Sequence, residues 1–396
     1  MKKMLLIFLT IMFCASLFAQ KEKYSSKEEN KYYKNLRRNF VSFRPLDTKL
    51  ILSFEPEYYE IHGTELNYEP YSPDKYLTPY ADSIFSILFS RNYDIWDIEV
   101  EKIGKIDKTQ ILKYEKRDSV EAFIYNSYEY ENIYFGEPGI WIGYSENNGK
   151  DWNYYYTGIV QRQPVFIKYY SRRPLIKAIG KLEIDACLLR QLSAFSHPGP
   201  GPSYECVKDG IYLVFDINVI AKDSDGDGLT DIVEDKLYTD KFNKDTDGDG
   251  IPDNLDTNPR IYYPRTEKSK IYEAVLDHRI DWDDTKEIGK LLFNENTTYN
   301  VTDSTETIII VTNNEDLMGI QPETYRVIFI TPQDYKNKTK TYKSELNAMY
   351  FSPLFKVDNK RDTYKIHYDF NTWGSKYLIR KTEEGWMIEI LSMWIS

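Results

Sequence analysis

The sequence predicts a β-rich α+β protein in which two mainly antiparallel-sheet domains are joined by an acidic repeat segment. The chain has 396 residues, which is too long for one ordinary hydrophobic core. Apolar residues make up 41 % of it, and its 35 tyrosines suit pleated, half-buried sheet surfaces. Near the middle, residues 223–234 read DSDGDGLTDIVE and residues 245–256 read DTDGDGIPDNLD, so one acidic pattern occurs twice.

The first 19 residues have the pattern of a bacterial secretory signal peptide. Lys2 and Lys3 form a basic start, an apolar run follows from Leu5 to Phe13, and Ala19 supplies a small residue at the cleavage point. This run is too short to span a membrane, and no other stretch is long and apolar enough to do so. We therefore expect a secreted or periplasmic protein, with residues 1–19 as its signal peptide.

A lipoprotein signal that ends at Cys14 is the alternative, and it would anchor the chain to the outer membrane. Such signals prefer small residues just before the cysteine, whereas Met12 and Phe13 are large.

Residues 20–222 form the predicted N-terminal domain, which starts with a polar lead-in. Turn signals separate several runs with strand composition. We expect strands at Lys49–Phe54, Val120–Tyr125, Ile140–Tyr144, Trp152–Tyr156, Val165–Tyr170 and Ile211–Ala221, and a short helix at Tyr80–Ser90.

One turn in this domain, SENNGKDW at residues 145–152, resembles the Asp-box hairpin of sialidase-like propellers. Ser145, Gly149 and Trp152 match that motif, but Asn147 stands where the family prefers Asp. A propeller would repeat the motif, which occurs once here, so a single β-hairpin is the favoured interpretation. The tyrosines also allow a carbohydrate-stacking surface as an alternative to sheet packing.

Residues 260–396 are predicted to form a small α+β domain. The segment RTEKSKIYEAVLDHRI predicts an amphipathic helix with Ile271, Val275 and His278 on one face. We expect antiparallel strands after it, at Thr307–Thr312, Tyr325–Thr331 and Thr363–Tyr368, and a final hairpin that turns at Glu384 and Gly385. His278 and His367 are candidate ligands or general bases, but lone histidines on mixed faces are more often structural.

Cys187 and Cys206 are the cysteines left after signal cleavage, and export permits a disulfide between them. They flank the turn-rich SHPGPGPSYE, which could bring two strands side by side. Buried free thiols are the alternative. A Cys/His catalytic pair is disfavoured because the four histidines lie in no nucleophile motif.

The acidic charge is concentrated in the repeat. The chain has a formal net charge of −11, and residues 223–256 alone hold twelve acidic residues and three lysines. The rest is close to neutral and has no basic stripe that could follow a phosphate backbone, so we expect no nucleic-acid partner.

The spacing of the repeated acids predicts calcium loops. Calcium takes about six to eight oxygen ligands, and a short loop can supply them only by wrapping around the ion. Side chains at positions one, three and five then point inward, a glycine turns the chain at six, seven gives a carbonyl, and nine and twelve complete the set. The first loop offers Asp223, Asp225, Asp227, the Leu229 carbonyl, Asp231 and Glu234, with Gly228 at the turn. The second offers Asp245, Asp247, Asp249, the Ile251 carbonyl, Asp253 and Asp256, with Gly250 at the turn.

Three features of these loops bear on their order and occupancy. Asp256 is one methylene shorter than Glu234, so its reach depends on the local backbone. Asp240, just before the second loop, is a further candidate for capping or binding. The segment has few apolar residues, so calcium must supply order. The main candidates for its core are Leu229, Ile232, Val233, Leu237, Ile251 and Leu255.

The repeat departs from other duplicated calcium loops. An EF-hand pair needs a helix before each loop, but IYLVFDINVIAK before Asp223 has strand composition, and Pro252 lacks the N–H that links such loops. Dockerins need a helix after each loop, and the proline-punctuated PDNLDTNP cannot continue far as one. The stretch DSDGDGLTDIVED to DTDGDGIPDNLDTNP instead resembles bacterial thrombospondin type-3 repeats over residues 223–259.

That resemblance implies a calcium-binding connector between two domains and an association with cell-surface and adhesion proteins. We therefore expect a secreted or periplasmic calcium-binding protein with a structural or adhesive role and a cell-surface or glycan partner. The alternative is an exported glycan-acting hydrolase or glycan-binding protein that uses calcium structurally. No HExxH, GxSxG, P-loop or zinc-ligand cluster occurs, so a non-enzymatic role is favoured.

Overall fold

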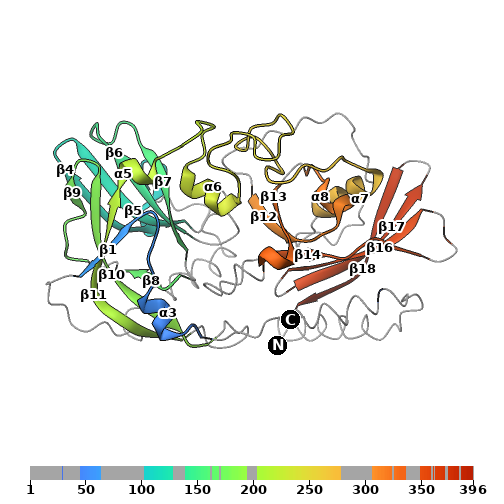
Figure 1. Cartoon of the computed structure of the whole chain (residues 1–396), viewed down its shortest axis with the longest axis horizontal. Helices are drawn as coiled ribbons and strands as arrows, with labels where there is room; N and C mark the ends of the chain where they lie inside the picture. The colour runs from blue at the N-terminus through green and yellow to red at the C-terminus, as the bar shows by residue number, and fades with distance from the viewer. Residues whose placement is uncertain are drawn as a thin grey trace, which may run out of the picture.

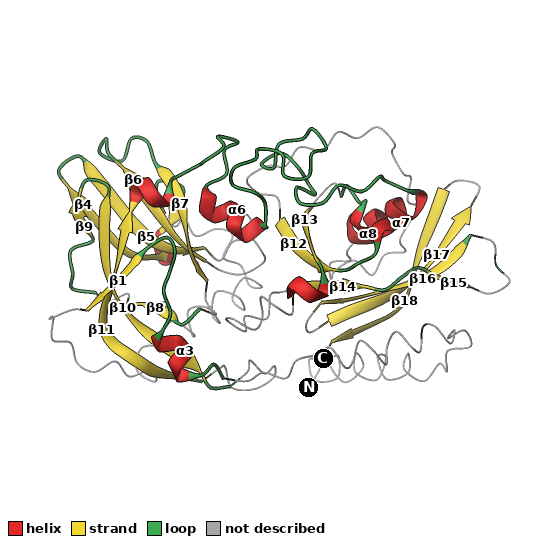
Figure 2. Cartoon of the chain, in the orientation of Figure 1, coloured by secondary structure: helices red, strands yellow, loops and turns green. Residues whose placement is uncertain are grey.

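The computed structural model confirms the β-rich α+β class, with sheets at both ends and the repeat between them (Figures 1 and 2). It describes residues 29, 45–63, 102–127, 139–160, 163–168, 171–193, 203–277, 306–322, 325–335, 348–357, 360, 362–370, 373–382 and 385–395. The predicted signal peptide 1–19, with Cys14, lies outside these residues, as do the predicted helix Tyr80–Ser90 and the side chains of His197 and His278. No helix in the described ranges has the length and apolar character needed to cross a membrane.

Two antiparallel sheets make up most of the N-terminal part. A five-stranded sheet has the order β1-β11-β10-β8, with β9 paired to β10, and a four-stranded meander runs β4-β5-β6-β7. The first contains β1 (Glu60–Gly63), β8 (Val165–Ile167), β9 (Ile176–Ala178), β10 (Lys181–Gln191) and β11 (Tyr204–Asp216). The second contains β4 (Ile111–Arg117), β5 (Val120–Ser127), β6 (Gly139–Ser145) and β7 (Asn153–Val160). The short β2 (Lys102–Ile103), β3 (Ile106–Asp107) and η2 (Lys108–Gln110) precede the meander.

The SENNGKDW stretch forms the single hairpin between β6 and β7. The Ser145 hydroxyl accepts from the Gly149 N–H at 3.1 Å, and Asn147 Oδ1 accepts from the Asp151 N–H at 2.9 Å. Asn148 and Gly149 both have positive φ, as a tight hairpin turn requires. The half-buried Trp152 ring packs on Phe123, so the turn contributes to the sheet core.

Two predicted strands are wrong because an aspartate caps a short helix in each of them. Lys49–Phe54 is helix α3 (Thr48–Leu52), and Asp47 caps it by accepting from the Lys49 N–H at 2.7 Å. Ile211–Ala221 continues β11 only to Asp216, whose side chain accepts from Asn218 N–H and starts helix α5 (Ile217–Ile220). In both places a cap overrides the β propensity of the apolar residues that follow.

The C-terminal part is a seven-stranded mixed sheet with helices on one face. Its order is β13-β12-β14-β16-β17-β18, with β15 paired to β16. The strands are β12 (Glu306–Val311), β13 (Tyr325–Ile330), β14 (Ala348–Phe351), β15 (Phe355–Lys356), β16 (Thr363–Phe370), β17 (Trp373–Thr382) and β18 (Gly385–Ile395). The predicted helix is present as α7 (Glu267–Asp277), and the short α8 (Glu315–Met318) follows β12.

The expected antiparallel order holds from β14 to β18, but β12 is parallel to both of its neighbours. Its residues are buried on both faces, as the near-continuous apolar run ETIIIV allows. Ile308 and Ile310 join the α7 side of the core, whereas Ile309 and Val311 belong to the apolar cluster that also contains the N-terminal sheets. The two ends of the protein therefore share a core.

A buried charge cluster ties Glu29 to the C-terminal sheet. Its carboxylate lies 3.0 Å from His367 Nε2 on β16, 2.8 Å from Lys376 Nζ on β17 and 3.7 Å from Lys365 Nζ. All four side chains are almost fully buried. His367, a candidate ligand or base from the sequence, is here part of this ion cluster.

Glu29→Gln should destabilise the protein at neutral pH by about 3 kcal/mol, because the buried Lys365 and Lys376 then lose their counter-charge and His367 loses an ionic partner. Burial disfavours ionisation of Glu29, but bonds from His367 and Lys376 and the charge of Lys365 lower its pKa to about 2. The contribution is thus present above the unfolded pKa of about 4.3 and is lost as pH falls toward 2.

Denaturant unfolding between pH 2 and 7 would measure this difference. The control is Glu60→Gln, which removes an exposed pair with His62 and should change the free energy of unfolding by under about 0.5 kcal/mol. An equal effect of the two substitutions at pH 7 would contradict the role assigned to Glu29.

Candidate metal centre

Each half of the repeat gathers three aspartates that could hold a metal ion. Ligand atoms of Asp223, Asp225 and Asp227 lie within 4.8 Å of one another, and so do those of Asp245, Asp247 and Asp249. The two loops are built alike, with the first aspartate receiving backbone N–H groups from positions four and six. Asp223 accepts from Gly226 at 2.6 Å and Gly228 at 3.0 Å, and Asp245 accepts from Gly248 at 2.8 Å and Gly250 at 2.9 Å.

The glycine at position six is required by the backbone. Gly228 has φ of +103° and Gly250 has φ of +96°, a region that side chains rarely adopt. This conformation folds positions one, three and five toward one centre.

The residue at position twelve adds a buried acid to each triplet. Glu234 is fully buried, and its Oε2 has no hydrogen-bond partner among the described residues. Burial, together with the charges of Asp225 and Asp227, raises the Glu234 pKa to about 8. A carboxylate held in this way lacks the positive charge that would stabilise its ionised form.

Asp256 holds the same position in the second loop despite its shorter side chain. It is 4 % exposed, its Oδ1 accepts from the Asn258 N–H at 2.8 Å, and its Oδ2 has no partner in the described chain. Burial and the charges of Asp249 and Asp247 raise its pKa to about 7. Two loops with the same arrangement thus each present an under-compensated, buried carboxylate.

The aspartates at position nine brace the loops. Asp231 accepts from the Ser224 N–H at 2.8 Å, from its hydroxyl at 2.9 Å and from Lys222 Nζ at 3.1 Å. Asp253 accepts from the Thr246 N–H at 2.9 Å and its hydroxyl at 2.6 Å. The hydroxyl at position two of each loop was not singled out from the sequence, although Ser and Thr at matching positions were a usable signal.

The two loops also contact each other. The Asn254 N–H donates to Asp227 Oδ2 at 3.2 Å, and Lys244 Nζ donates to the Gly226 carbonyl at 3.1 Å. Asp240 accepts from the Phe242 N–H at 3.1 Å and so stabilises the turn between the loops. The triplets therefore belong to one folded unit.

The first loop leads into a helix that the sequence analysis did not predict. Helix α6 (Asp231–Leu237) carries Glu234 and lies between β7 and β12 (Figure 1). Ile232, Val233 and Leu237 are buried in the apolar cluster that both ends of the protein share. The Tyr58 hydroxyl donates to Asp235 on the exposed side of the helix.

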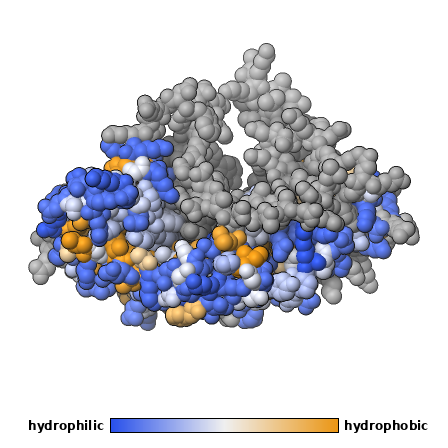
Figure 3. Space-filling model, turned by 90° about the horizontal axis from the view of Figure 1, so that it is seen from above, coloured by the Kyte–Doolittle hydropathy of each residue, from blue (hydrophilic) through white to orange (hydrophobic). Residues whose placement is uncertain are grey.

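The second loop is fixed to the C-terminal sheet by polar contacts. Arg326 at the start of β13 donates to the Asn254 carbonyl at 2.8 Å and the Asp256 carbonyl at 3.3 Å. The Val327 N–H donates to the Thr257 carbonyl at 2.7 Å. The predicted core residues Ile251 and Leu255 are instead 39 % and 49 % exposed. The described residues that are visible in Figure 3 are mostly hydrophilic, with small separate hydrophobic patches.

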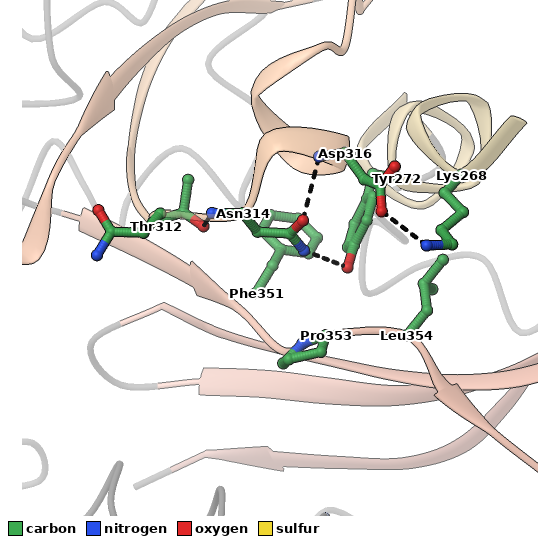
Figure 4. Close-up of a pocket in the computed structure, with 9 residues that line it drawn as sticks. Lys268, Tyr272, Thr312, Asn314, Asp316, Phe351, Pro353 and Leu354 are labelled. Carbon is green, nitrogen blue, oxygen red and sulfur yellow. Dashed lines mark hydrogen bonds and ion pairs between the residues drawn. The ribbon is translucent and has the colours of Figure 1, made fainter. Parts of the chain in front are cut away.

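A hollow separate from the metal loops lies where β12 and β14 end. An open hollow of about 520 Å³ is lined by Lys268, Tyr272, Thr312, Asn313, Asn314, Asp316, Phe351, Pro353 and Leu354 (Figure 4). Its polar groups bond to one another: Lys268 Nζ lies 2.9 Å from Asp316, and Asn314 Nδ2 donates to the Tyr272 hydroxyl at 2.9 Å. This lining offers no nucleophile with an adjacent base.

Comparisons with known proteins give no further assignment. No model of a protein family matches the chain, and no curated protein or solved structure is significantly similar to it.

Glu234→Gln should stabilise the metal-free protein at pH 8, by about 4 kcal/mol if the whole pKa shift is recovered. The folded-state pKa of Glu234 is raised above its unfolded value, so the ionised carboxylate opposes folding increasingly as pH rises from about 4.3 to 8. Asp231→Asn should do the opposite, because hydrogen bonds from Ser224 and Lys222 lower the Asp231 pKa despite burial.

Thermal unfolding in chelator at pH 5 and pH 8 tests both substitutions. A destabilising effect of Glu234→Gln at pH 8 would show that its carboxylate is already compensated without an ion.

Proposed function

We propose that residues 223–259 bind two calcium ions and form a calcium-stiffened connector in an exported protein with a structural or adhesive role. The observation that carries this proposal is the buried acid at position twelve of each loop, which has an oxygen without a partner beside three clustered aspartates. A bound divalent cation would supply the missing positive charge.

The donor set favours calcium over other divalent ions. Residues 223–256 contain no histidine or cysteine, so they lack the nitrogen and sulfur ligands that zinc prefers. Three aspartates, a carbonyl from Leu229 or Ile251 and a position-twelve carboxylate would give about six or seven oxygens, which suits calcium. Magnesium keeps several waters and rarely occupies all-protein cages. Asp231 and Asp253 would hold the loop starts, or reach the ion through water.

The connector role follows from what each loop touches. Glu234, a proposed ligand, lies on α6, whose apolar side chains enter the shared core. Asp256 is the equivalent proposed ligand, and Arg326 donates to its carbonyl and to that of Asn254. An ion in either loop would thus set the position of a neighbouring domain.

Resemblance to thrombospondin type-3 repeats and the predicted signal peptide support the exported, surface-associated setting. The Asp-box-like hairpin stabilises its own turn, and the hollow beside β12 has mutually bonded polar groups, so neither favours the alternative glycan-acting hydrolase.

Calcium should bind with a stoichiometry of two and raise the melting temperature of the full chain, because folding of this segment and ion binding are coupled. Isothermal titration calorimetry and thermal unfolding would measure both. Magnesium at the same concentration is the control and should have a much smaller effect. Absence of calcium binding at about 1 mM would overturn the proposal.

Chelation should loosen the connector. Limited proteolysis is expected to produce new cuts within residues 223–259 after calcium removal, and small-angle scattering should show an increased radius of gyration. Unchanged dimensions and protease resistance would contradict the connector role while leaving calcium binding intact.

Arg326→Met should separate binding from coupling. It removes two charge-assisted bonds to the second loop, worth about 2–3 kcal/mol together, but no proposed ligand. Calcium stoichiometry should stay at two, while calcium no longer slows hydrogen exchange in β13. Arg380→Met, which breaks an exposed pair with Glu389, is the matched control and should leave that protection unchanged.

A further inference from the structure

The two cysteines lie side by side on neighbouring strands. Cys206 of β11 is in register next to Leu189, two residues beyond Cys187 on β10. Between Ile211 and Cys206, β11 carries two more residues than the paired stretch of β10 from Ala186 to Leu189, so the ladder is bulged here. Cys206 packs against the buried cluster of Cys187 and Leu189.

Their surroundings make the two sulfurs unequal. Cys187 is fully buried and Cys206 is partly exposed, in an apolar cluster with Leu189, Phe166 and Tyr204. Burial raises the pKa of Cys187, whereas the hydrogen bond from Cys187 lowers the pKa of Cys206. Asp209 raises the pKa of both thiols and the buried Lys168, whose Nζ pairs with it, lowers the pKa of both; at Cys206 the effect of Asp209 is the larger.

We propose that Cys187 and Cys206 form a redox-active dithiol that closes to a disulfide by exchange with an external disulfide. The Cys206 thiolate attacks one sulfur of the external disulfide, forms a mixed disulfide and releases one thiolate. Cys187 then loses its proton to solvent and attacks the Cys206 sulfur, releasing the second thiolate. The two protein thiols are oxidised to one disulfide, and the external disulfide is reduced to two thiols.

The geometry assigns the order of these steps. Cys206 is the sulfur that an external reagent can reach, and its thiolate has a donor next to it. Cys187 is shielded from outside reagents, but it belongs to the cluster against which Cys206 packs, so it is placed to resolve the mixed disulfide. The cross-link would fasten the bulged end of the β10–β11 pair, at a site separate from the metal loops.

The chain without the predicted signal peptide, and therefore without Cys14, is first reduced and then incubated with oxidised glutathione; intact mass and peptide mapping test this inference. Wild type should lose two hydrogen masses and yield a Cys187–Cys206 linked peptide. Cys187→Ser should instead retain one glutathione at Cys206. Cys206→Ser should react about tenfold more slowly than Cys187→Ser, because its remaining thiol is buried.

Three results would overturn the inference: wild type that keeps both thiols, wild type that accumulates the glutathione adduct, or equal reactivity of the two single variants. Calcium stoichiometry of each variant, measured in parallel, should stay at two. A loss of calcium binding in wild type would concern the proposed connector and not the dithiol.

Discussion

The structure depends on the burial of negative charge from the repeat next to an apolar core. Glu234 is fully buried on a helix whose other inward residues, Ile232, Val233 and Leu237, are in the core shared by both ends of the protein. Burial of these apolar side chains stabilises α6 against the core, and the Glu234 carboxylate on the same helix is buried with them. Its charge then sits near those of Asp225 and Asp227, a cost that an ion would remove. Packing of α6 into the shared core and the charge that Glu234 brings with it are therefore coupled.

The two loops are held in place by different neighbours. Because the local sequence repeats, both loops have aspartates at positions one, three and five and a glycine at position six. Both also have an aspartate at position nine that is hydrogen-bonded to position two. They differ from position eight onward: the first loop continues as α6 from Asp231, whereas the second has Pro252 and leads toward Arg326. One loop is held by apolar burial and the other by bonds from a guanidinium to main-chain carbonyls. Through this asymmetry one repeated motif makes two different contacts, one with the shared apolar core and one with the C-terminal sheet.

Sequence reasoning identified the acidic loops and most central strands because their signals are local. The aspartate spacing needs only a short loop, and β5, β6 and β12 have strongly apolar or β-branched runs. It was wrong where one polar residue outweighed composition, at Asp47 and Asp216. The parallel pairing of β12 was also missed, because register between distant strands depends on packing partners that no local pattern specifies. Arg326 and Asn254 were unpredictable for the same reason, as their roles exist only once the loops meet the sheet.

The exposed apolar residues of the second loop show how little hydrophobic burial holds it in place. Ile251 and Leu255 look like core residues in sequence, yet they remain about half exposed because no helix follows to turn them inward. The loop thus gains little hydrophobic stabilisation of its own. Its order comes from hydrogen bonds that Asp245 and Asp253 accept and from those that Arg326 donates. A cation bound at Asp256 would add to these. If the proposed ions bind, the shape of such a segment should follow their occupancy closely, since few other interactions oppose its loosening. The first loop is also held by α6 in the core, so under the calcium proposal the second loop should loosen first when calcium is removed.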